Sequence, residues 1–118
     1  MIASQKSDEP LIADAKIFNP EKGKGTDYIA RGFNPIYLYT LDYNEPFGYL
    51  IIYNTSGKDL RFALVNQEQS TPFVVHNSKT IFIVTIDIFP YETSASRRGP
   101  LRTVEITEED LIRIIEKE

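Results

Sequence analysis

Short stretches of the chain carry hydrophobic residues in the patterns of β-strands. Side-chain direction in a strand repeats every two residues, so residues 11–18 (LIADAKIF) would present two distinct faces. Asp14 and Lys16 would share one of them. The two faces are Leu11, Ala13, Ala15 and Ile17 on one side, and Ile12, Asp14, Lys16 and Phe18 on the other.

Three further stretches predict strands. Residues 48–54 (GYLIIYN) form a continuous apolar run that is typical of a buried strand. Residues 60–66 (LRFALVN) follow a turn at residues 55–59 and predict a third strand. Residues 80–89 (TIFIVTIDIF) are almost all apolar or β-branched and predict the longest strand of the protein.

Apolar residues at helical spacing follow the first strand and predict a helix that begins near Thr26. Thr26 suits the N-cap position, and Asp27 in the first turn complements the helix dipole. Pro35 lies inside this pattern, where a proline costs about 3 kcal/mol. Asn34 and Pro35 also suit the N-cap and first positions of a helix, so we expect the helix to break and restart there.

The C-terminal residues carry a complete helix-start signal. Thr107 is the predicted N-cap, and the acidic residues 108–110 fill the first turn, where they complement the helix dipole. Ile106 and Leu111 stand at the two positions of a hydrophobic staple, which fixes how the chain enters a helix. We predict an amphipathic helix at this end of the chain.

The order of these elements predicts an α/β fold. A strand, a helix and a second strand in succession favour a right-handed βαβ crossover with two parallel strands. We expect a mixed β-sheet of about four strands, one crossover helix and a C-terminal helix. Residues 10–118 would form a single domain, and the polar residues 1–9 a flexible N-terminus.

Composition narrows the chemistry that the chain can perform. The 118 residues include no cysteine and one histidine, His76. Disulfides, thiolate metal sites and sites with two imidazoles from one chain are therefore excluded. No segment resembles a signal peptide or reaches the roughly 20 apolar residues of a membrane span, so we expect a cytoplasmic protein without a membrane partner.

The formal net charge of −4 is unevenly distributed. Residues 105–118 hold six acidic and two basic residues, so that the rest of the chain is neutral. An acidic chain argues mildly against tight nucleic-acid binding, although a local basic face remains compatible with this charge.

Asp14 and Lys16 allow two interpretations. One is an exposed charge pair of little energetic value. The other is half of a metal-dependent nuclease site, because phosphodiester cleavage needs a carboxylate to hold Mg²⁺ and a cation near the attacking water. The predicted βαβ unit favours the second interpretation, since it places such a strand in the sheet centre, where ligand crevices form.

From residue 10 onward the chain resembles the PD-(D/E)XK, or restriction-endonuclease-like, superfamily. LIADAKIF matches the (D/E)XK strand, and a helix and the GYLIIYN strand follow in the family's order. The resemblance implies a restriction-endonuclease-like fold, Mg²⁺ and a DNA substrate. It assigns metal binding to Asp14 and to the carbonyl of Ala15, and catalysis to Lys16. Tyr39 matches the tyrosine of a Gln-x-x-x-Tyr motif on the family's helix, whereas Pro35 stands in place of the glutamine.

The second metal-binding acid of this family lies on a preceding strand, and this chain has few residues there. Asp8 and Glu9 are too close to Asp14 to lie on a separate paired strand. We therefore expect the N-terminal part of the family core to be missing. The chain would then be a fragment, a degenerate member of the family or one partner of a composite site, and an active enzyme would take the carboxylate from elsewhere, for instance from a partner chain. Asp87 is another candidate for this role, although the alternating face of an edge strand explains it equally well.

Basic residues near these motifs are candidates for binding DNA phosphates. Lys22, Lys24 and Arg31 would extend a basic face beside Lys16. In the loop SASRRG, residues 94–99, Arg97 and Arg98 could grip phosphates, and a solvated basic loop is the alternative.

The leading hypothesis is a nuclease-like domain that hydrolyses DNA phosphodiester bonds with Mg²⁺. The alternative is a catalytically incomplete binding or assembly module on the same scaffold. In that case the exposed edge of the strand at residues 11–18 would support a homodimer, because unpaired strand edges invite pairing. A small α/β domain with a purely structural charge pair is the third reading.

Overall fold

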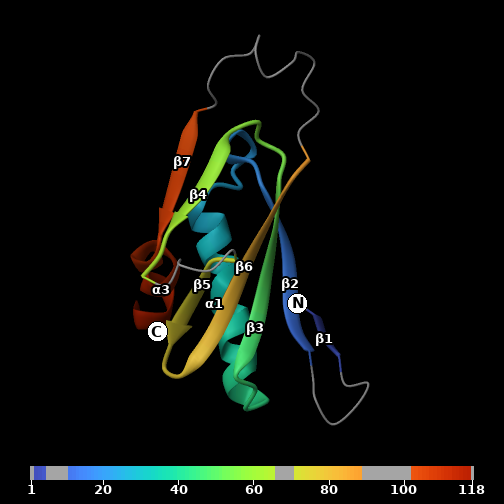
Figure 1. Cartoon of the computed structure of the whole chain (residues 1–118), viewed down its shortest axis with the longest axis vertical. Helices are drawn as coiled ribbons and strands as arrows, with labels where there is room; N and C mark the ends of the chain where they lie inside the picture. The colour runs from blue at the N-terminus through green and yellow to red at the C-terminus, as the bar shows by residue number, and fades with distance from the viewer. Residues whose placement is uncertain (1, 5–10, 66–70, 89–101, 118) are drawn as a thin grey trace.

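A computed structural model describes residues 2–4, 11–65, 71–88 and 102–117 (Figure 1). The chain has a mixed α/β architecture, as the sequence predicts. None of the helices in these ranges is both long and apolar enough to cross a membrane. The elements in chain order are β1 (Ile2–Ser4), β2 (Leu11–Phe18), the 3₁₀ helix η1 (Pro20–Lys22), α1 (Thr26–Asp42), β3 (Phe47–Asn54), β4 (Asp59–Ala63), β5 (Phe73–His76), β6 (Lys79–Asp87), β7 (Thr103–Thr107) and α3 (Glu108–Lys117).

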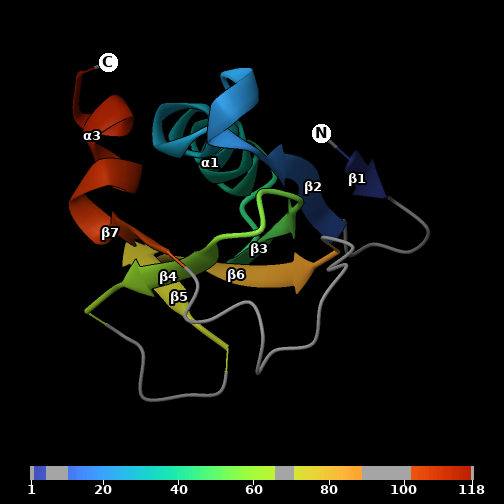
Figure 2. The same cartoon turned by 90° about the horizontal axis from the view of Figure 1, so that it is seen from above.

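The main sheet has five strands in the order β1-β2-β3-β6-β5. The central strands β2, β3 and β6 are parallel, and the outer strands β1 and β5 are antiparallel to their neighbours. The predicted βαβ unit is present, since α1 connects the adjacent parallel strands β2 and β3. Helices α1 and α3 lie on the same side of this sheet and pack against each other (Figure 2).

The core lies between α1 and one face of the main sheet. Alternate residues of each parallel strand point into it, as the period of two requires. The strand β3 is therefore fully buried on one face and half-buried on the other, whereas its continuous apolar sequence had predicted a buried strand. The main fully buried side chains are Ile12, Phe18, Leu50, Ile52, Ile81 and Ile83 from the strands and Ile29, Phe33 and Ile36 from α1.

Helix α1 corrects two expectations. Gly25 takes the N-cap position in place of Thr26, which is the first helical residue. The helix also continues through Pro35, where we expected it to break. The lost hydrogen bond costs about 3 kcal/mol. Burial of Phe33 and Ile36 on either side of the proline contributes about 1.5–3 kcal/mol each, which outweighs this cost.

Strand β4 is shorter than predicted and does not join the main sheet. It pairs in parallel with β7, a strand that the sequence analysis did not expect, to form a separate two-stranded sheet. The predicted longest strand is confirmed as β6, which has nine residues. It is an interior strand, which corrects the edge position considered for Asp87.

The start of α3 is built as predicted. The Oγ1 of Thr107 accepts a hydrogen bond from the backbone N–H of Asp110 at 3.1 Å, and the Asp110 carboxylate accepts one from the Thr107 N–H at 3.0 Å. This reciprocal pair is a capping box. Both staple residues, Ile106 and Leu111, are fully buried.

Thr107→Ala is expected to lower the free energy of unfolding by about 1 kcal/mol, because it leaves the N–H of Asp110 without its cap. Urea denaturation would measure the change. Thr103→Ala, at the exposed start of β7, is the matched control and should change stability less. Equal effects of the two substitutions would contradict a capping role for Thr107.

The N-terminal residues include a strand where the sequence analysis expected a flexible segment. Ile2–Ser4 pairs with Leu11–Ala13 of β2 in antiparallel register. The unpaired N–H and C=O groups of a strand edge favour such pairing. The edge of β2 is therefore covered at its start, and β1 provides no pairing beyond Ala13.

Candidate functional site

Asp14 and Lys16 lie on the face of β2 that α1 covers. The Nζ atom of Lys16 is 3.4 Å from Oδ2 of Asp14, and the Asp14 side chain is only 11% exposed. The other carboxylate oxygen accepts a hydrogen bond from the backbone N–H of Ala15 at 2.9 Å. The shared face is confirmed, and the interpretation as an exposed surface pair is wrong, because the helix shields the carboxylate.

The methylene stem of Lys16 crosses α1 at Gly32. A Cβ atom at position 32 would lie 2.9 Å from Cγ and 3.0 Å from Cε of the lysine, closer than real Cβ contacts come. Gly32 is itself buried. The absence of a side chain at Gly32 therefore creates the passage through which the lysine reaches Asp14. The sequence held one signal of this role, a glycine in the middle of a helical pattern.

Tyr28 of α1 holds two ammonium groups. Its ring centroid is 5.6 Å from Nζ of Lys16 and 5.8 Å from Nζ of Lys24. Such cation–π contacts stabilise an ammonium over the electron-rich ring face. The structure thus joins Lys16 and Lys24, which are eight positions apart, at one side chain that the sequence analysis did not single out.

A tight turn positions Lys24 beside this ring. The backbone N–H of Asn19 donates to the carbonyl of Lys24 at 2.8 Å, and the N–H of Lys24 donates to the carbonyl of Asn19 at 3.0 Å. Between them Gly23 has a φ of 75°, a conformation that favours glycine. The geometry of the turn therefore depends on Gly23.

Two more predicted basic residues lie on the segments that carry Lys24 and Tyr28. Lys22 is exposed at the end of η1, and Arg31 is exposed three residues after Tyr28 on α1, where residues lie on the same side of the helix. Glu21 and Asp27 belong to the same segments and reduce the positive charge. The result is a weakly basic surface beside Lys16.

Tyr39 lies farther along α1. It is seven residues beyond Gly32, which is about 10 Å at the rise of an α-helix. Its ring stacks on that of Tyr43 at 5.9 Å between centroids. The structure places Tyr39 at the other half of the helix from the lysine stem.

Asp87 is too distant to share a metal ion with Asp14. Asp14 pairs across the sheet with Leu50 and then Ile83, and Asp87 lies four residues beyond Ile83. At 4.8 Å per strand and 3.3 Å per residue the separation is about 16 Å. The Asp87 carboxylate instead accepts a hydrogen bond from Asn54 at 2.8 Å.

Within the described ranges no three His, Cys, Asp or Glu side chains group as a metal site would. A single carboxylate still fits Mg²⁺, which usually keeps several waters and is held by one or two carboxylates together with substrate phosphates. Asp14 meets the requirement of one such ligand. The carbonyl of Ala15 belongs to the same strand as Asp14. The methyl side chain of Ala15 points to the face of the sheet opposite Asp14.

Four of the predicted or considered side chains lie outside the described residues. They are Asp8, Glu9, Arg97 and Arg98. Strand β1 precedes β2 and pairs with it, as the family resemblance requires of a preceding strand, but Ile2–Ser4 contains no acid. The source of a second carboxylate is thus not among the described residues near Asp14.

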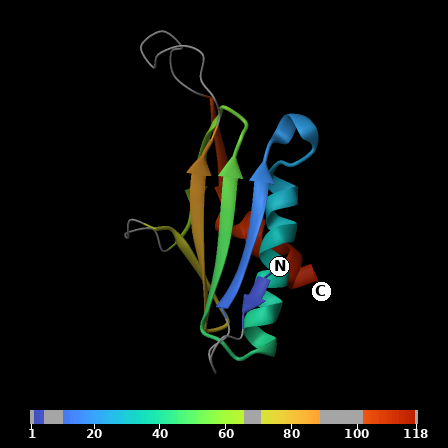
Figure 3. The ribbon, with the colours of Figure 1, turned by 90° about the vertical axis from the view of Figure 1, so that its right-hand side faces the viewer.

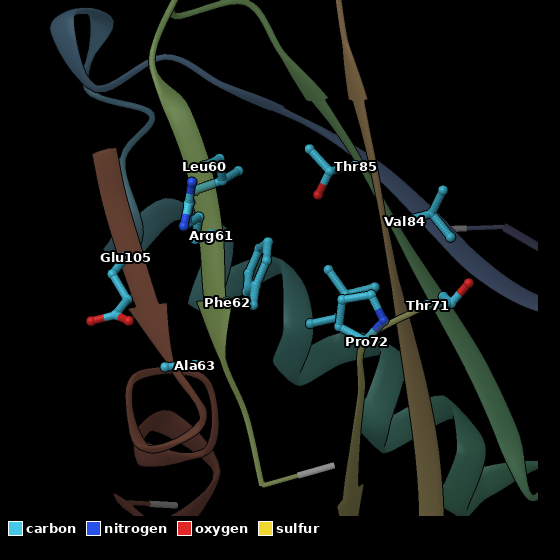
Figure 4. A pocket seen from close by; sticks show the side chains of 10 residues that line it. Leu60, Arg61, Phe62, Ala63, Thr71, Pro72, Val84, Thr85 and Glu105 are labelled. Carbon is cyan, nitrogen blue, oxygen red and sulfur yellow. The ribbon is translucent and has the colours of Figure 1, made fainter. Parts of the chain in front are cut away.

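A cavity of about 640 Å³ lies elsewhere, between β6 and the β4–β7 sheet (Figure 4). Leu60, Phe62 and Pro72 contribute apolar walls, and Arg61 and Glu105 contribute charge. Arg61 is paired with its neighbour Asp59 at 2.6 Å. None of the residues predicted from the sequence to form the site lines this cavity.

No protein-family model, curated protein or solved structure matches this chain. The resemblance to the PD-(D/E)XK superfamily therefore rests on Asp14, Lys16 and Tyr39 and on the order of the elements around them.

Proposed function

We propose that this chain is a restriction-endonuclease-like domain that hydrolyses DNA phosphodiester bonds with Mg²⁺. The observation that carries the proposal is the 3.4 Å pair between Lys16 Nζ and Asp14 Oδ2, shielded by α1. Gly32 and Tyr28 both contact this lysine and hold it beside Asp14, which is the fixed geometry that a reacting group needs. The proposed location is the cytoplasm.

Asp14 and Lys16 divide the chemistry between them. Bound Mg²⁺ would polarise the scissile phosphate and lower the pKa of its bound water. Asp14 would hold the metal through its carboxylate, one oxygen of which also accepts the N–H of Ala15. Lys16 would donate a hydrogen bond to the attacking water and orient it, and its charge would stabilise the phosphorane oxygens.

The basic surface beside Lys16 would hold the DNA backbone. Lys22, Lys24 and Arg31 would contact phosphates beside the reacting group, and Lys22 and Arg31 are exposed. Arg97 and Arg98 complete the proposed set. Such contacts position the duplex without reading its sequence, so we expect weak sequence preference from them and a strong dependence on salt.

The proposed site needs a second carboxylate from a partner chain or from residues outside the described ranges. A partner strand that paired with the edge of β2 beyond Ala13, which β1 does not cover, would lie next to Asp14. Tyr39 would act through the substrate or a partner, since it lies about 10 Å along α1 from Gly32.

A specific observation favours a second candidate, the catalytically incomplete assembly module. The described residues around Asp14 supply one carboxylate, whereas the opposite face of the sheet offers a broad apolar surface. On this reading the ion pair positions α1 on the sheet, and the protein functions by associating with another chain.

Asp14→Asn is expected to raise the Mg²⁺ concentration for half-maximal cleavage at least tenfold. Mutation of a residue that only hydrogen-bonds to a metal ligand typically lowers the affinity for the metal by about 10–100-fold. Asp14 would itself be a ligand, so its loss should cost at least as much. The assay would follow nicking of supercoiled DNA and cutting of single-stranded DNA with Mg²⁺ or Mn²⁺.

The matched control is Asp59→Asn, which removes the carboxylate of another ion pair, with Arg61, in the second sheet. It should leave the metal requirement unchanged. Cutting that persists in EDTA would sink the nuclease proposal. No cutting by the wild-type chain with either metal would favour the assembly module.

A further inference from the structure

No described helix lies on the face of the main sheet opposite α1 (Figures 2 and 3). We call it the bare face. Residues that pair across the sheet share a side, so its members follow from the strand registers. They are Leu11, Ala13, Ala15 and Ile17 of β2, Phe47, Tyr49, Ile51 and Tyr53 of β3, Thr80, Phe82, Val84 and Ile86 of β6, and Phe73 and Val75 of β5.

None of these residues of the bare face has an acidic or basic side chain, that is, an Asp, Glu, Lys, Arg or His. Its polar atoms are hydroxyls, from Thr80 and two tyrosines. Parallel strands such as β2, β3 and β6 normally have both of their faces covered. Here several large side chains are exposed by 37–51%. They are Leu11, Ile17, Phe47, Val75, Val84 and Ile86.

Aromatic side chains of the bare face pack against one another. The ring of Phe82 lies at the centre of a cluster of four aromatic rings, with centroid distances of 5.5 Å to Tyr49, 5.7 Å to Phe73 and 5.8 Å to Phe47. Beside this cluster lies a groove of about 300 Å³, partly floored by the small side chain of Ala13. The aromatic rings around Phe82 therefore stand beside a hollow that reaches from Leu11 and Ala13 of β2 across β3 to Val84 and Ile86 of β6.

We propose that the bare face binds the bare face of a second copy of this chain. If a large side chain has an accessible surface of roughly 150 Å², the lower end of the range for aromatic side chains, its six most exposed members contribute roughly 400 Å² and its half-buried ones roughly 200 Å² more. Two copies would thus bury roughly 1,200 Å², the lower limit of a stable protein interface.

The shape of the face fits a copy of itself. A two-fold axis along the strands, in the plane of the interface, sets the β2 side of one copy over the β5 and β6 side of the other. The alanines Ala13 and Ala15 would then face the aromatic cluster around Phe82. Two sheets pack about 10 Å apart when their side chains interdigitate in this manner.

The chemistry of the face also favours a second copy. Self-association places each group near its own counterpart, where like charges would repel, and none of the bare-face residues of β2, β3, β5 and β6 is charged. Arg61 and Glu105, which line the cavity of about 640 Å³ together with Val84, are opposite in sign. Asp14 and Lys16 lie on the opposite side of the sheet. The dimer therefore leaves both sites open, and a copy bound here does not supply their second carboxylate.

Sedimentation over roughly 1–200 μM protein tests the proposal, and we expect a monomer–dimer equilibrium with a micromolar Kd. Ile86→Lys should weaken the dimer at least a hundredfold, because it places an unpaired ammonium in an apolar interface. Leu38→Lys is the matched control, since Leu38 is 41% exposed on α1 and Ile86 is 39% exposed. The control should keep the wild-type Kd.

Circular dichroism would establish that both variants are folded, and Val84→Ser gives a milder change on the same face. A wild-type chain that stays monomeric at the highest concentration overturns the proposal. So does a folded Ile86→Lys variant that dimerises as tightly as wild type, which would assign association to another surface such as the edge of β2. Both results are independent of DNA cleavage.

Discussion

Gly32→Ala is expected to lower the rate of Mg²⁺-dependent DNA cleavage about a hundredfold. The added methyl group would lie 2.9 Å from Cγ of Lys16, so the whole lysine side chain must move. Its ammonium would then leave the position 3.4 Å from Asp14. A displacement of about 1 Å in a reacting group can cost this much in rate.

The same substitution should not unfold the protein. Alanine is more favourable than glycine inside a helix by about 1 kcal/mol, which offsets the cost of moving the flexible lysine. Urea denaturation should show a free energy of unfolding within about 1 kcal/mol of wild type. Loss of activity without loss of stability would separate a positioning role of Gly32 from a structural one.

Two further variants make this test specific. Lys16→Ala should lower the rate at least as much as Gly32→Ala, and the double variant should lose no more than Lys16→Ala alone, because both changes act through one side chain. Gly25→Ala is the matched control. Its added Cβ would meet Pro20 at an ordinary 3.4 Å. Cleavage by Gly32→Ala at the wild-type rate would contradict the positioning role of Gly32, and cleavage by Lys16→Ala at that rate would contradict the role of Lys16.

Phe33→Ala is expected to lower the free energy of unfolding by about 3–5 kcal/mol. Phe33 is completely buried between α1 and the sheet, so truncation removes its apolar contacts and leaves a cavity. This loss is a large part of the roughly 5–15 kcal/mol that stabilises an ordinary domain. We expect much of the variant to be unfolded at moderate temperature.

Leu38→Ala on the same helix is the control for Phe33→Ala. Leu38 is exposed on the side of α1 that faces away from the sheet, so its truncation should cost less than about 1 kcal/mol. Urea denaturation of both variants measures the difference. Similar losses from the two substitutions would contradict the packing of α1 through Phe33.

The sequence determined the features that depend on neighbouring residues. The alternation in LIADAKIF placed Asp14 and Lys16 on one face, and the structure confirms it. The N-cap at Thr107 was predicted for the same reason. The βαβ unit was predicted from the order of the elements along the chain. Strand periodicity and helix caps act within about four residues, so the chain itself records them.

The tertiary structure decided what lies next to these elements. Packing carried α1 through Pro35, and pairing with distant residues created β7 and gave a partner strand to Ile2–Ser4. Sequence patterns carry little information about such contacts, because each element offers a face or an edge without specifying its partner.

The candidate site shows the same division. The sequence identified Asp14, Lys16 and Lys24, but only packing showed that Gly32 admits the lysine stem and that Tyr28 lies against two ammonium groups. Packing also placed Asp87 on β6, with β3 between it and the strand of Asp14, and left one face of the sheet bare. The chemistry of each residue is written in the sequence, whereas the distances between residues far apart in the chain are set by how a helix docks on a sheet.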